Sequence, residues 1–263
     1  MSAAAPRIDG PLTDPELAVA LVTAAGRLAA RMRADGVESD RKTGFSDIVT
    51  SADLAAEALV TEALDRLRPD DGLLGEEGAA RESRSGRSWV VDPVDGTWNF
   101  ATGLLSWCSA IALADGHGPL LGAVHHPVAD ETWLGGRDLP TTCNAIAVDR
   151  LVDRALDEVT LATYIHPTTV SDPDVLEPFL AIVRSPATPR ILGSASCDLA
   201  AVAGGRLGAW AQHSVAPWDW LPGKALVDAA GGSTYVEEHR GHVWCLAGNP
   251  RSAAELRTVL LDS

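Results

Sequence analysis

The sequence predicts a mixed α/β protein made of two tightly joined halves that meet near Asp149. Three observations favour this fold class. Apolar residues recur at helical spacing in the N-terminal segment, short apolar runs typical of strands fill the middle, and strand-like and helix-like segments alternate after Asp149. We therefore expect an α+β half over residues 1–148 and an α/β half over residues 149–263, joined as one compact unit.

Two helices are expected near the start of the chain. Thr13 and Glu16 have the spacing of a capping box ahead of the first apolar face. The second helix runs roughly from Asp53 to Leu67, and Pro69 closes it.

Strands dominate the middle of the chain. The segment Asp115-Gly116-His117-Gly118 separates two apolar runs and predicts a hairpin. In order, strands are expected over residues 89–91, 107–114, 120–126 and 131–134.

The C-terminal half is expected to alternate. If Asp219 is the N-cap of its helix, Pro222 falls in the first turn, where a missing N–H costs little. Ser252 with Glu255 predicts a capping box for the last helix. Strands are expected near 159–164, 190–192, 207–211, 233–236 and 243–247, and helices from 172, over 195–203 and over 220–230.

Composition narrows the class of function. The 263-residue chain has 46% apolar residues and a formal net charge of −15, which argues against a nucleic-acid partner because no Lys/Arg cluster offsets it. No apolar run approaches the length that spans a bilayer, so no membrane role is expected. The four cysteines are widely spaced and predict reduced thiols in a cytoplasmic protein, with Cys108 and Cys197 interpreted as core residues rather than nucleophiles.

The segment Trp-Val-Val-Asp-Pro-Val-Asp-Gly-Thr over residues 89–97 is the most informative motif. Its apolar run predicts a buried strand that ends at Asp92, and Asp95 follows three residues later. Gly96 and Thr97 offer backbone N–H groups beside these carboxylates. Two hard anionic ligands next to such a turn predict a metal-bridged phosphate site.

Three more acidic segments accompany this motif. They are Val-Thr-Ser-Ala-Asp ending at Asp53, Gly-Glu-Glu-Gly with Glu76 and Glu77, and Trp-Asp-Trp around Asp219. In this order the segments resemble the signature of the inositol monophosphatase superfamily, the lithium-sensitive, magnesium-dependent phosphomonoesterases, from about Lys42 to Gly232. The resemblance implies a layered α/β/α/β/α sandwich like that of inositol monophosphatases and fructose bisphosphatases, Mg²⁺ as cofactor, a small phosphate monoester as substrate, and a homodimer.

The resemblance also implies the metal ligands. Glu76 and Asp92, with the backbone carbonyl of Val94, would hold a first ion, and Asp92 would bridge to a second ion held also by Asp95 and Asp219. Glu76 would touch a third, weaker ion through waters. Four carboxylates bring a charge of −4 that two Mg²⁺ neutralise, so a phosphate dianion can enter. Mn²⁺ is expected to substitute, and Li⁺ to inhibit.

The remaining site residues are implied in the same way. Asp53 and Thr97 would act as catalytic residues, with Asp53 orienting the Thr97 hydroxyl that positions the attacking water, and Glu76 would join them. Lys42 stands where the family often has a lysine, and a solvated lysine is the favoured interpretation. Substrate or phosphate is expected to contact Asp95, Gly96, Thr97, Ala195, Gln212 and Asp219.

Two departures from the family pattern leave the substrate open. Trp98 replaces a small polar residue or lysine, and Gln212 replaces a glutamate seven residues before the distal Asp. Gln212 weakens the case for a cationic substrate because the swap removes a negative charge. Inositol 1-phosphate is the nominal substrate. Histidinol phosphate, a sugar phosphate, a nucleotide 3′-phosphate, and a non-catalytic metal- or phosphate-binding role are the alternatives.

Overall fold

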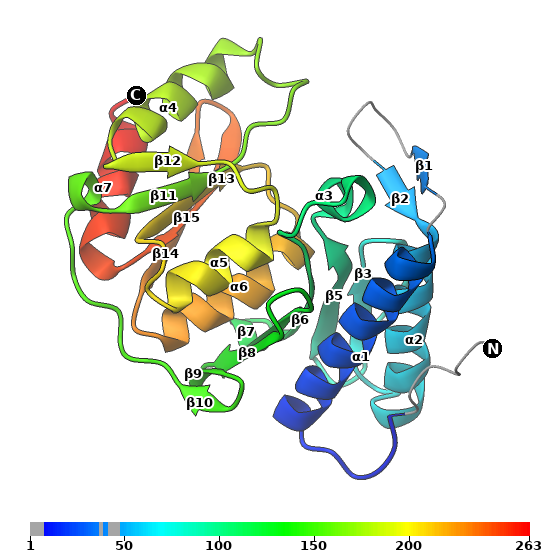
Figure 1. Cartoon of the computed structure of the whole chain (residues 1–263). Coiled ribbons are helices and arrows are strands. Elements are labelled where there is room, and N and C mark those ends of the chain that lie inside the picture. Colours follow the sequence, from blue (N-terminus) through cyan, green and yellow to red (C-terminus); the bar gives the residue numbers. More distant parts are fainter. Residues whose placement is uncertain (1–7, 37–38, 42–47) are drawn as a thin grey trace.

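The computed structural model describes residues 8–36, 39–41 and 48–263. For residues 39–41 and 48 it describes the backbone only. Helices and sheets alternate in five layers, α/β/α/β/α, which confirms the predicted layered sandwich (Figure 1). One pair of helices covers the outer face of the first sheet, a second pair lies between the sheets, and a third covers the second sheet. These pairs are α1 (Asp14–Asp35) with α2 (Ser51–Leu67), α5 (Ala195–Ala203) with α6 (Pro217–Ala229), and α4 (Pro173–Arg184) with α7 (Pro250–Leu261).

The first sheet has eight strands in the order β10-β9-β8-β7-β6-β5-β3-β4. Neighbouring strands in this sheet are antiparallel, except β3 and β5, which run parallel to each other. The strands are β3 (Gly72–Gly75), β4 (Ala80–Arg81), β5 (Ser88–Asp95), β6 (Cys108–Asp115), β7 (Gly118–His126), β8 (Glu131–Gly136), β9 (Leu139–Cys143) and β10 (Ile146–Ala147).

The second sheet has five strands in the order β12-β11-β13-β15-β14, with β11 parallel to both of its neighbours. Its strands are β11 (Thr160–Thr163), β12 (Thr188–Arg190), β13 (Ala209–His213), β14 (Ser233–His239) and β15 (His242–Gly248). The smaller elements are β1 (Ser39–Arg41), β2 (Ile48–Thr50), α3 (Thr97–Thr102) and the 3-10 helix η1 (Leu156–Glu158). The predicted boundary near Asp149 falls between the last strand of one sheet and the first of the other, and as a domain boundary it stays a prediction.

Two predicted helix starts are wrong. Helix α6 begins at Pro217 with Ala216 as N-cap, so Asp219 lies in its first turn and Pro222 inside the helix. Helix α7 begins at Pro250, because the Asn249 side chain accepts the Ser252 N–H. In both cases a proline at the first helical position marks the start, where its fixed φ suits the helix and its missing N–H has no intrahelical partner to lose.

Helix α6 lies directly against the first sheet. At Gly122 on β7, a Cβ would overlap the backbone of Pro222, so only glycine allows this approach. On the other side of the helix, a Cβ at Gly223 would overlap Leu199 of α5. The backbone of α6 is therefore closely packed between β7 and α5, and this packing fixes the position of the helix between them.

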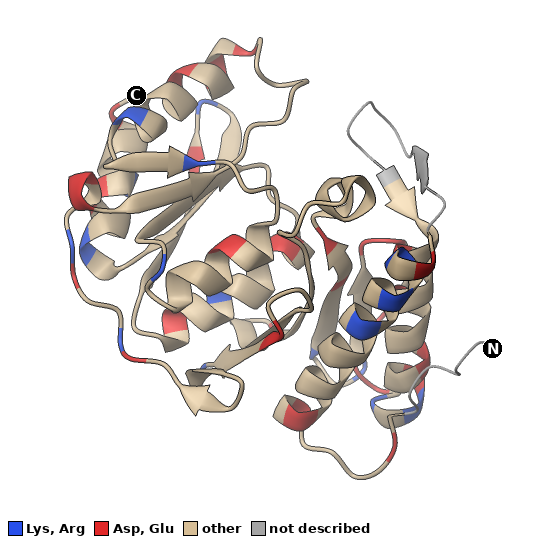
Figure 2. Cartoon of the chain, in the orientation of Figure 1, with Lys and Arg blue, Asp and Glu red and all other residues tan. Residues whose placement is uncertain are grey.

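Charge is distributed over the whole fold. Figure 2 shows Lys and Arg scattered among Asp and Glu on the helices of both halves rather than gathered on one of them. Within the described part of the chain, no helix combines the length and apolar character needed to cross a membrane.

Candidate active site

Strand β5 brings two predicted metal ligands together. Asp92 and Asp95 are 1% and 5% exposed, and the pairing of β5 with β6 shifts register between them. Residues three apart on a regular strand point to opposite faces, so this irregularity is what brings both carboxylates to one side. Pro93 has no N–H to lose there, and the Val94 N–H donates to Asp92 Oδ1 at 3.0 Å. The prediction that this strand ends at Asp92 is therefore wrong, because β5 continues to Asp95.

Asp219 and Glu76 complete an acidic cluster. Carboxylate oxygens of Asp92, Asp95 and Asp219 all lie within 4.8 Å of one another. Glu76 follows β3 directly, and its side chain hydrogen-bonds with Asp92. Because β3 and β5 are parallel neighbours, their C-terminal ends meet at the same sheet edge. The structure therefore brings together all four carboxylates predicted as ligands.

Burial and mutual repulsion dominate the electrostatics of this cluster. Burial raises the pKa of Asp92 well above its usual value, and the charges of Glu76, Asp95 and Asp219 raise it further. Burial is also the largest cause that raises the pKa of Asp219, and the charges of Asp95 and Glu76 raise it further. The ion pairs among described residues lie elsewhere and do not include Asp92, Asp95 or Asp219. Buried hard oxygen donors at this spacing fit a divalent cation such as Mg²⁺.

Thr97 and Asp53 lie beside the cluster in the predicted pairing. The Thr97 hydroxyl has two acceptors in reach, Asp53 Oδ1 at 3.2 Å and the Val94 carbonyl at 3.0 Å, and its single proton serves one at a time. Asp53 is fully buried in the first turn of α2, where its Oδ2 accepts the N–H and the hydroxyl of Thr50. Burial raises the pKa of Asp53 although these hydrogen bonds oppose the rise.

Backbone groups surround Asp95 and the start of α3. Gly96 has φ +92°, and a Cβ there would lie 2.9 Å from the Ser106 carbonyl, so this turn requires glycine. The N–H groups of Ala195 and Ser196 at the start of α5 point to Asp95, with Ser196 N 2.5 Å from Oδ2. Ala195 therefore lies next to the cluster, as predicted.

Two positions that the sequence singles out, Gln212 and Trp98, do not join this cluster. Gln212 is half-buried on β13, and no hydrogen bond of the described residues links its side chain to the carboxylates. Trp98 follows Thr97 and is 46% exposed. Lys42 lies outside the described residues.

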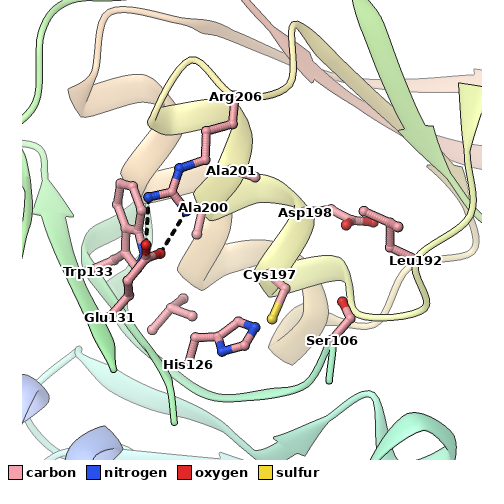
Figure 3. A pocket seen from close by; sticks show the side chains of 11 residues that line it. Ser106, His126, Glu131, Trp133, Leu192, Cys197, Asp198, Ala200, Ala201 and Arg206 are labelled. Carbon is pink, nitrogen blue, oxygen red and sulfur yellow. Dashed lines mark hydrogen bonds and ion pairs between the residues drawn. The ribbon is translucent and has the colours of Figure 1, made fainter. Parts of the chain in front are cut away.

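A separate cavity of about 170 Å³ lies beside the first turn of α5 (Figure 3). Cys197, His126 and Asp198 line it, and none of its lining residues is a predicted site residue. Burial raises the pKa of Cys197, but hydrogen bonds with Cys108 and His126 outweigh burial and lower it to about 6. Cys108 is buried as predicted, whereas Cys197 faces this cavity.

Sequence reasoning missed Glu57. This α2 residue is 6% exposed, and its two carboxylate oxygens accept the N–H groups of Glu77 and Ala79, each at 2.9 Å. A polar residue in an amphipathic helix carries no signal that its partner is a backbone turn about twenty residues later. Glu77, the second acidic residue of the Gly-Glu-Glu-Gly motif, thus contacts Glu57 through its own N–H.

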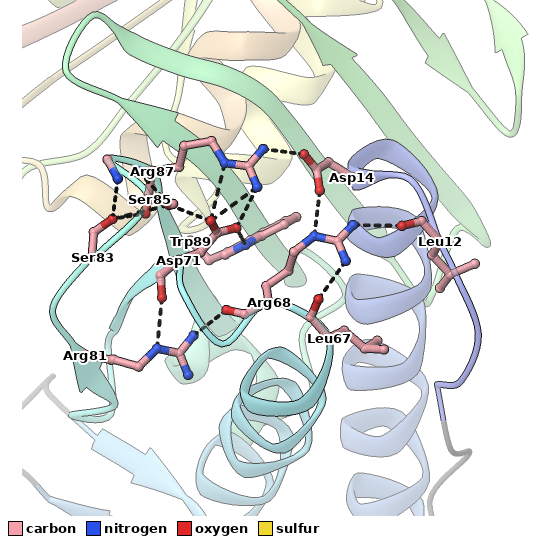
Figure 4. Close-up of polar contacts among 11 residues, drawn as sticks. Leu12, Asp14, Leu67, Arg68, Asp71, Arg81, Ser83, Ser85, Arg87 and Trp89 are labelled. Carbon is pink, nitrogen blue, oxygen red and sulfur yellow. Dashed lines mark hydrogen bonds and ion pairs between the residues drawn. The ribbon is translucent and has the colours of Figure 1, made fainter.

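Asp71 is a second missed residue, and it holds the opposite end of β5 (Figure 4). It is 3% exposed, and Oδ2 accepts the indole N–H of Trp89 at 3.0 Å and pairs with Arg87 at 2.9 Å. Arg87 also bonds Asp14 of α1, which binds Arg68 after α2. This network ties β5 to both outer helices away from the cluster.

The fold and the carboxylate cluster define the class of layered α/β phosphoric monoester hydrolases. The chain belongs to the inositol monophosphatase family, whose model matches residues 13–260 and whose members are generally metal-dependent. It is 28% identical to the inositol-1-monophosphatase of Bacillus subtilis over 89% of this chain and 91% of that protein. It is 31% identical to the Nus factor SuhB of Escherichia coli over 94% and 97%. The solved inositol monophosphatase of Anabaena superposes with a TM-score of 0.81 at 26% identity, covering 94% and 95% of the two chains. The resemblance predicted from the motifs is confirmed.

Proposed function

We propose that the protein is a Mg²⁺-dependent phosphatase that hydrolyses a small phosphate monoester, nominally inositol 1-phosphate, by direct attack of water. The observation that carries the proposal is the convergence of Asp92, Asp95 and Asp219 within 4.8 Å at the edge where Glu76 also lies. The B. subtilis relative, named inositol-1-monophosphatase, supports the nominal substrate.

The carboxylates would hold the cation. Glu76, Asp92 and the Val94 carbonyl would hold one ion, and Asp92, Asp95 and Asp219 a second, with Mn²⁺ as a substitute and Li⁺ as an inhibitor. When bound, the ions would supply positive charge for the phosphate and the leaving oxygen and would lower the pKa of the attacking water. Asp95 keeps its orientation through the N–H groups at the start of α5.

Thr97 and Asp53 would position the attacking water. If the Val94 carbonyl faces a cation, the Thr97 hydroxyl proton goes to Asp53 Oδ1. The Thr97 oxygen then has a lone pair for a proton of the water, which directs a water lone pair toward phosphorus. The N–H groups of Gly96 and Thr97 would bind phosphate oxygens beside Asp95 and Asp219, and Ala195 would contact the substrate at the edge of the cluster.

The part of the substrate beyond the phosphate would lie between Trp98 and Gln212. Gln212 is neutral and can both donate and accept hydrogen bonds, which suits hydroxyl groups better than an ammonium. We therefore favour a polyol phosphate over histidinol phosphate, and keep sugar phosphates and nucleotide 3′-phosphates as alternatives.

A phosphatase panel with purified full chain tests the proposal. Phosphate release from inositol 1-phosphate, histidinol phosphate, fructose 1,6-bisphosphate and adenosine 3′-phosphate is measured with Mg²⁺, with Mg²⁺ plus Li⁺, and with EDTA. We expect Mg²⁺-dependent turnover that Li⁺ suppresses, highest on the polyol phosphate. Metal binding without turnover on any monoester would instead favour a non-catalytic binding role.

We also infer a homodimer in the cytoplasm. Leu104 and Leu105 are 55% and 64% exposed, and Ile191 and Leu192 are 57% and 41% exposed. Asn99 joins the two loops, because its Nδ2 donates to the carbonyls of Ser106 and Leu192 at 2.7 Å each. This apolar surface supports association with a second copy. Four free cysteines are consistent with a reducing compartment.

A further inference from the structure

Helix α2 carries two buried carboxylates one turn apart. Asp53 and Glu57 are 0% and 6% exposed and lie at i and i+4, so they share one face of the helix. Asp53 contacts Thr97, whereas Glu57 faces the turn that leaves β3. The same helix face thus reaches two separate parts of the candidate active site.

The contact between Glu57 and that turn is specific. Oε2 accepts the Glu77 N–H and Oε1 accepts the Ala79 N–H, each at 2.9 Å. At Gly75, a Cβ would overlap the Glu57 carboxylate, so the turn has a glycine where the carboxylate must approach. Hydrogen bonds to a charged acceptor are about twice as strong as neutral ones, and both oxygens are used here.

The turn between these contacts presents Glu76. Its own N–H donates to the Val91 carbonyl at 3.1 Å, one residue before Asp92, which sets where Glu76 enters the cluster. Glu57 holds the next residue, Glu77, and so sets where the chain leaves. With both sides held, the backbone of Glu76 is fixed beside Asp92, with which its side chain hydrogen-bonds.

We infer that Glu57 is a positioning residue that sets the metal affinity of the site by clamping the turn that presents Glu76. The inference rests on the proposed metal-dependent function and deepens it. Glu57 itself would touch neither metal nor substrate. Its removal would leave two backbone N–H groups without their acceptors and would free Glu76 to turn away from Asp92.

Glu57→Gln tests the inference because it keeps the shape but offers only one acceptor oxygen. Binding of Mn²⁺ and Mg²⁺ to the metal-free full chain is measured by calorimetry, and the Mg²⁺ concentration for half-maximal hydrolysis of inositol 1-phosphate is measured alongside. We expect both to weaken by about tenfold or more, the usual cost of losing a group that orients a metal ligand. At saturating Mg²⁺, kcat should stay close to that of the wild type.

Two further variants complete the experiment. Glu62→Gln, at an exposed position of the same helix, should leave metal affinity unchanged. Gly75→Ala should weaken it, because the new Cβ displaces the Glu57 carboxylate from the other side. Unfolding temperatures in EDTA report on folding separately.

The outcomes separate the two proposals. A folded Glu57→Gln variant with wild-type metal affinity would overturn the positioning role, and so would loss of cooperative unfolding in both Glu57→Gln and Gly75→Ala. A wild-type chain that binds metal but hydrolyses no monoester would refute the proposed function instead, while calorimetry still reads the effect of Glu57.

Discussion

The Thr97 hydroxyl lies 3.2 Å from Oδ1 of Asp53, a carboxylate 44 positions earlier in the chain. Asp53 is completely buried and keeps its other oxygen on Thr50, so it is held in place before any substrate arrives. The pair therefore joins the first turn of α2 to the first turn of α3 beside the carboxylate cluster.

Loss of this pair should abolish most turnover. We expect Thr97→Ala and Asp53→Asn to lower kcat by about 10²- to 10⁴-fold, the range for a positioned acid–base group. Metal affinity should change little, since neither side chain is a proposed ligand. Thr102→Ala, which removes an exposed hydroxyl at the end of the same short helix, is the matched control. Full activity of Thr97→Ala would contradict the assigned role.

Metal should stabilise the fold through the acidic cluster. At a Mg²⁺ concentration of 100 times Kd, a single site raises the free energy of unfolding by about 2.7 kcal/mol. Asp95→Asn keeps an acceptor for Ser196 but removes a charge, so we expect this metal effect to disappear while stability in EDTA rises. Thermal unfolding with Mg²⁺ and with EDTA measures both effects, and Asp262→Asn at an exposed position should behave as the wild type. An Mg²⁺ response that survives in Asp95→Asn would exclude Asp95 as a ligand.

His125 should make the fold sensitive to moderate acid. Burial lowers its pKa from 6.5 to about 4, so the unfolded chain binds a proton that the folded chain refuses between these values. The free energy of unfolding should therefore fall as pH drops from about 6.5 to about 4. His125→Gln has no titrating side chain at this position. The difference in the free energy of unfolding between wild type and variant should therefore shrink as the pH falls through that range and stay constant above pH 7. Denaturant titrations at several pH values measure it, and a difference independent of pH would refute the buried neutral imidazole.

Cys197 should be the reactive thiol of the chain. With a pKa of about 6, it is mostly thiolate at pH 7, whereas burial raises the pKa of Cys245 to about 12. We expect iodoacetamide to label Cys197 at pH 7, with a rate that falls below about pH 6, and to leave Cys245 unmodified. His126→Gln should move the midpoint to higher pH. Mass spectrometry locates the label, and equal labelling of both cysteines would contradict the prediction.

We expect dimer formation to depend on the exposed apolar residues of two loops, Leu104 and Leu105 in one and Ile191 and Leu192 in the other. A charge at the most exposed of these leucines, Leu105→Lys, should convert a dimer to monomers in light scattering, because a buried unpaired charge is costly. Val236→Lys places the same charge on β14, at a residue that is 56% exposed, and should leave the dimer intact. A wild-type chain that is monomeric at all concentrations would refute the association.

Much of the fold follows from local signals. Helix α5 spans Ala195–Ala203 as predicted, since Ser194 accepts the Cys197 N–H at its start and Gly204 ends it. The predicted starts of α6 and α7 are wrong. Asp219 and Ser252 are good capping residue types, yet the helices begin at Pro217 and Pro250. Residue type alone does not say which of two nearby signals a helix uses.

The carboxylate cluster was predictable because its members stand in ordered motifs, but their supports were not. Glu57 and Asp71 have no motif, and their partners are a backbone turn and an indole that only the folded chain brings near. The irregularity of β5 was also missed, because a strand with a proline between two carboxylates gives the same pattern as a strand that ends.

The close packing at Gly122 has a consequence for the metal-free protein. Since the α6 backbone packs on the sheet at Pro222 and on Leu199 at Gly223, this packing opposes movement of Asp219 away from Asp92 when their charges repel. Bound protons or a cation would relieve that repulsion, so we expect the acidic cluster to bind an ion with little rearrangement.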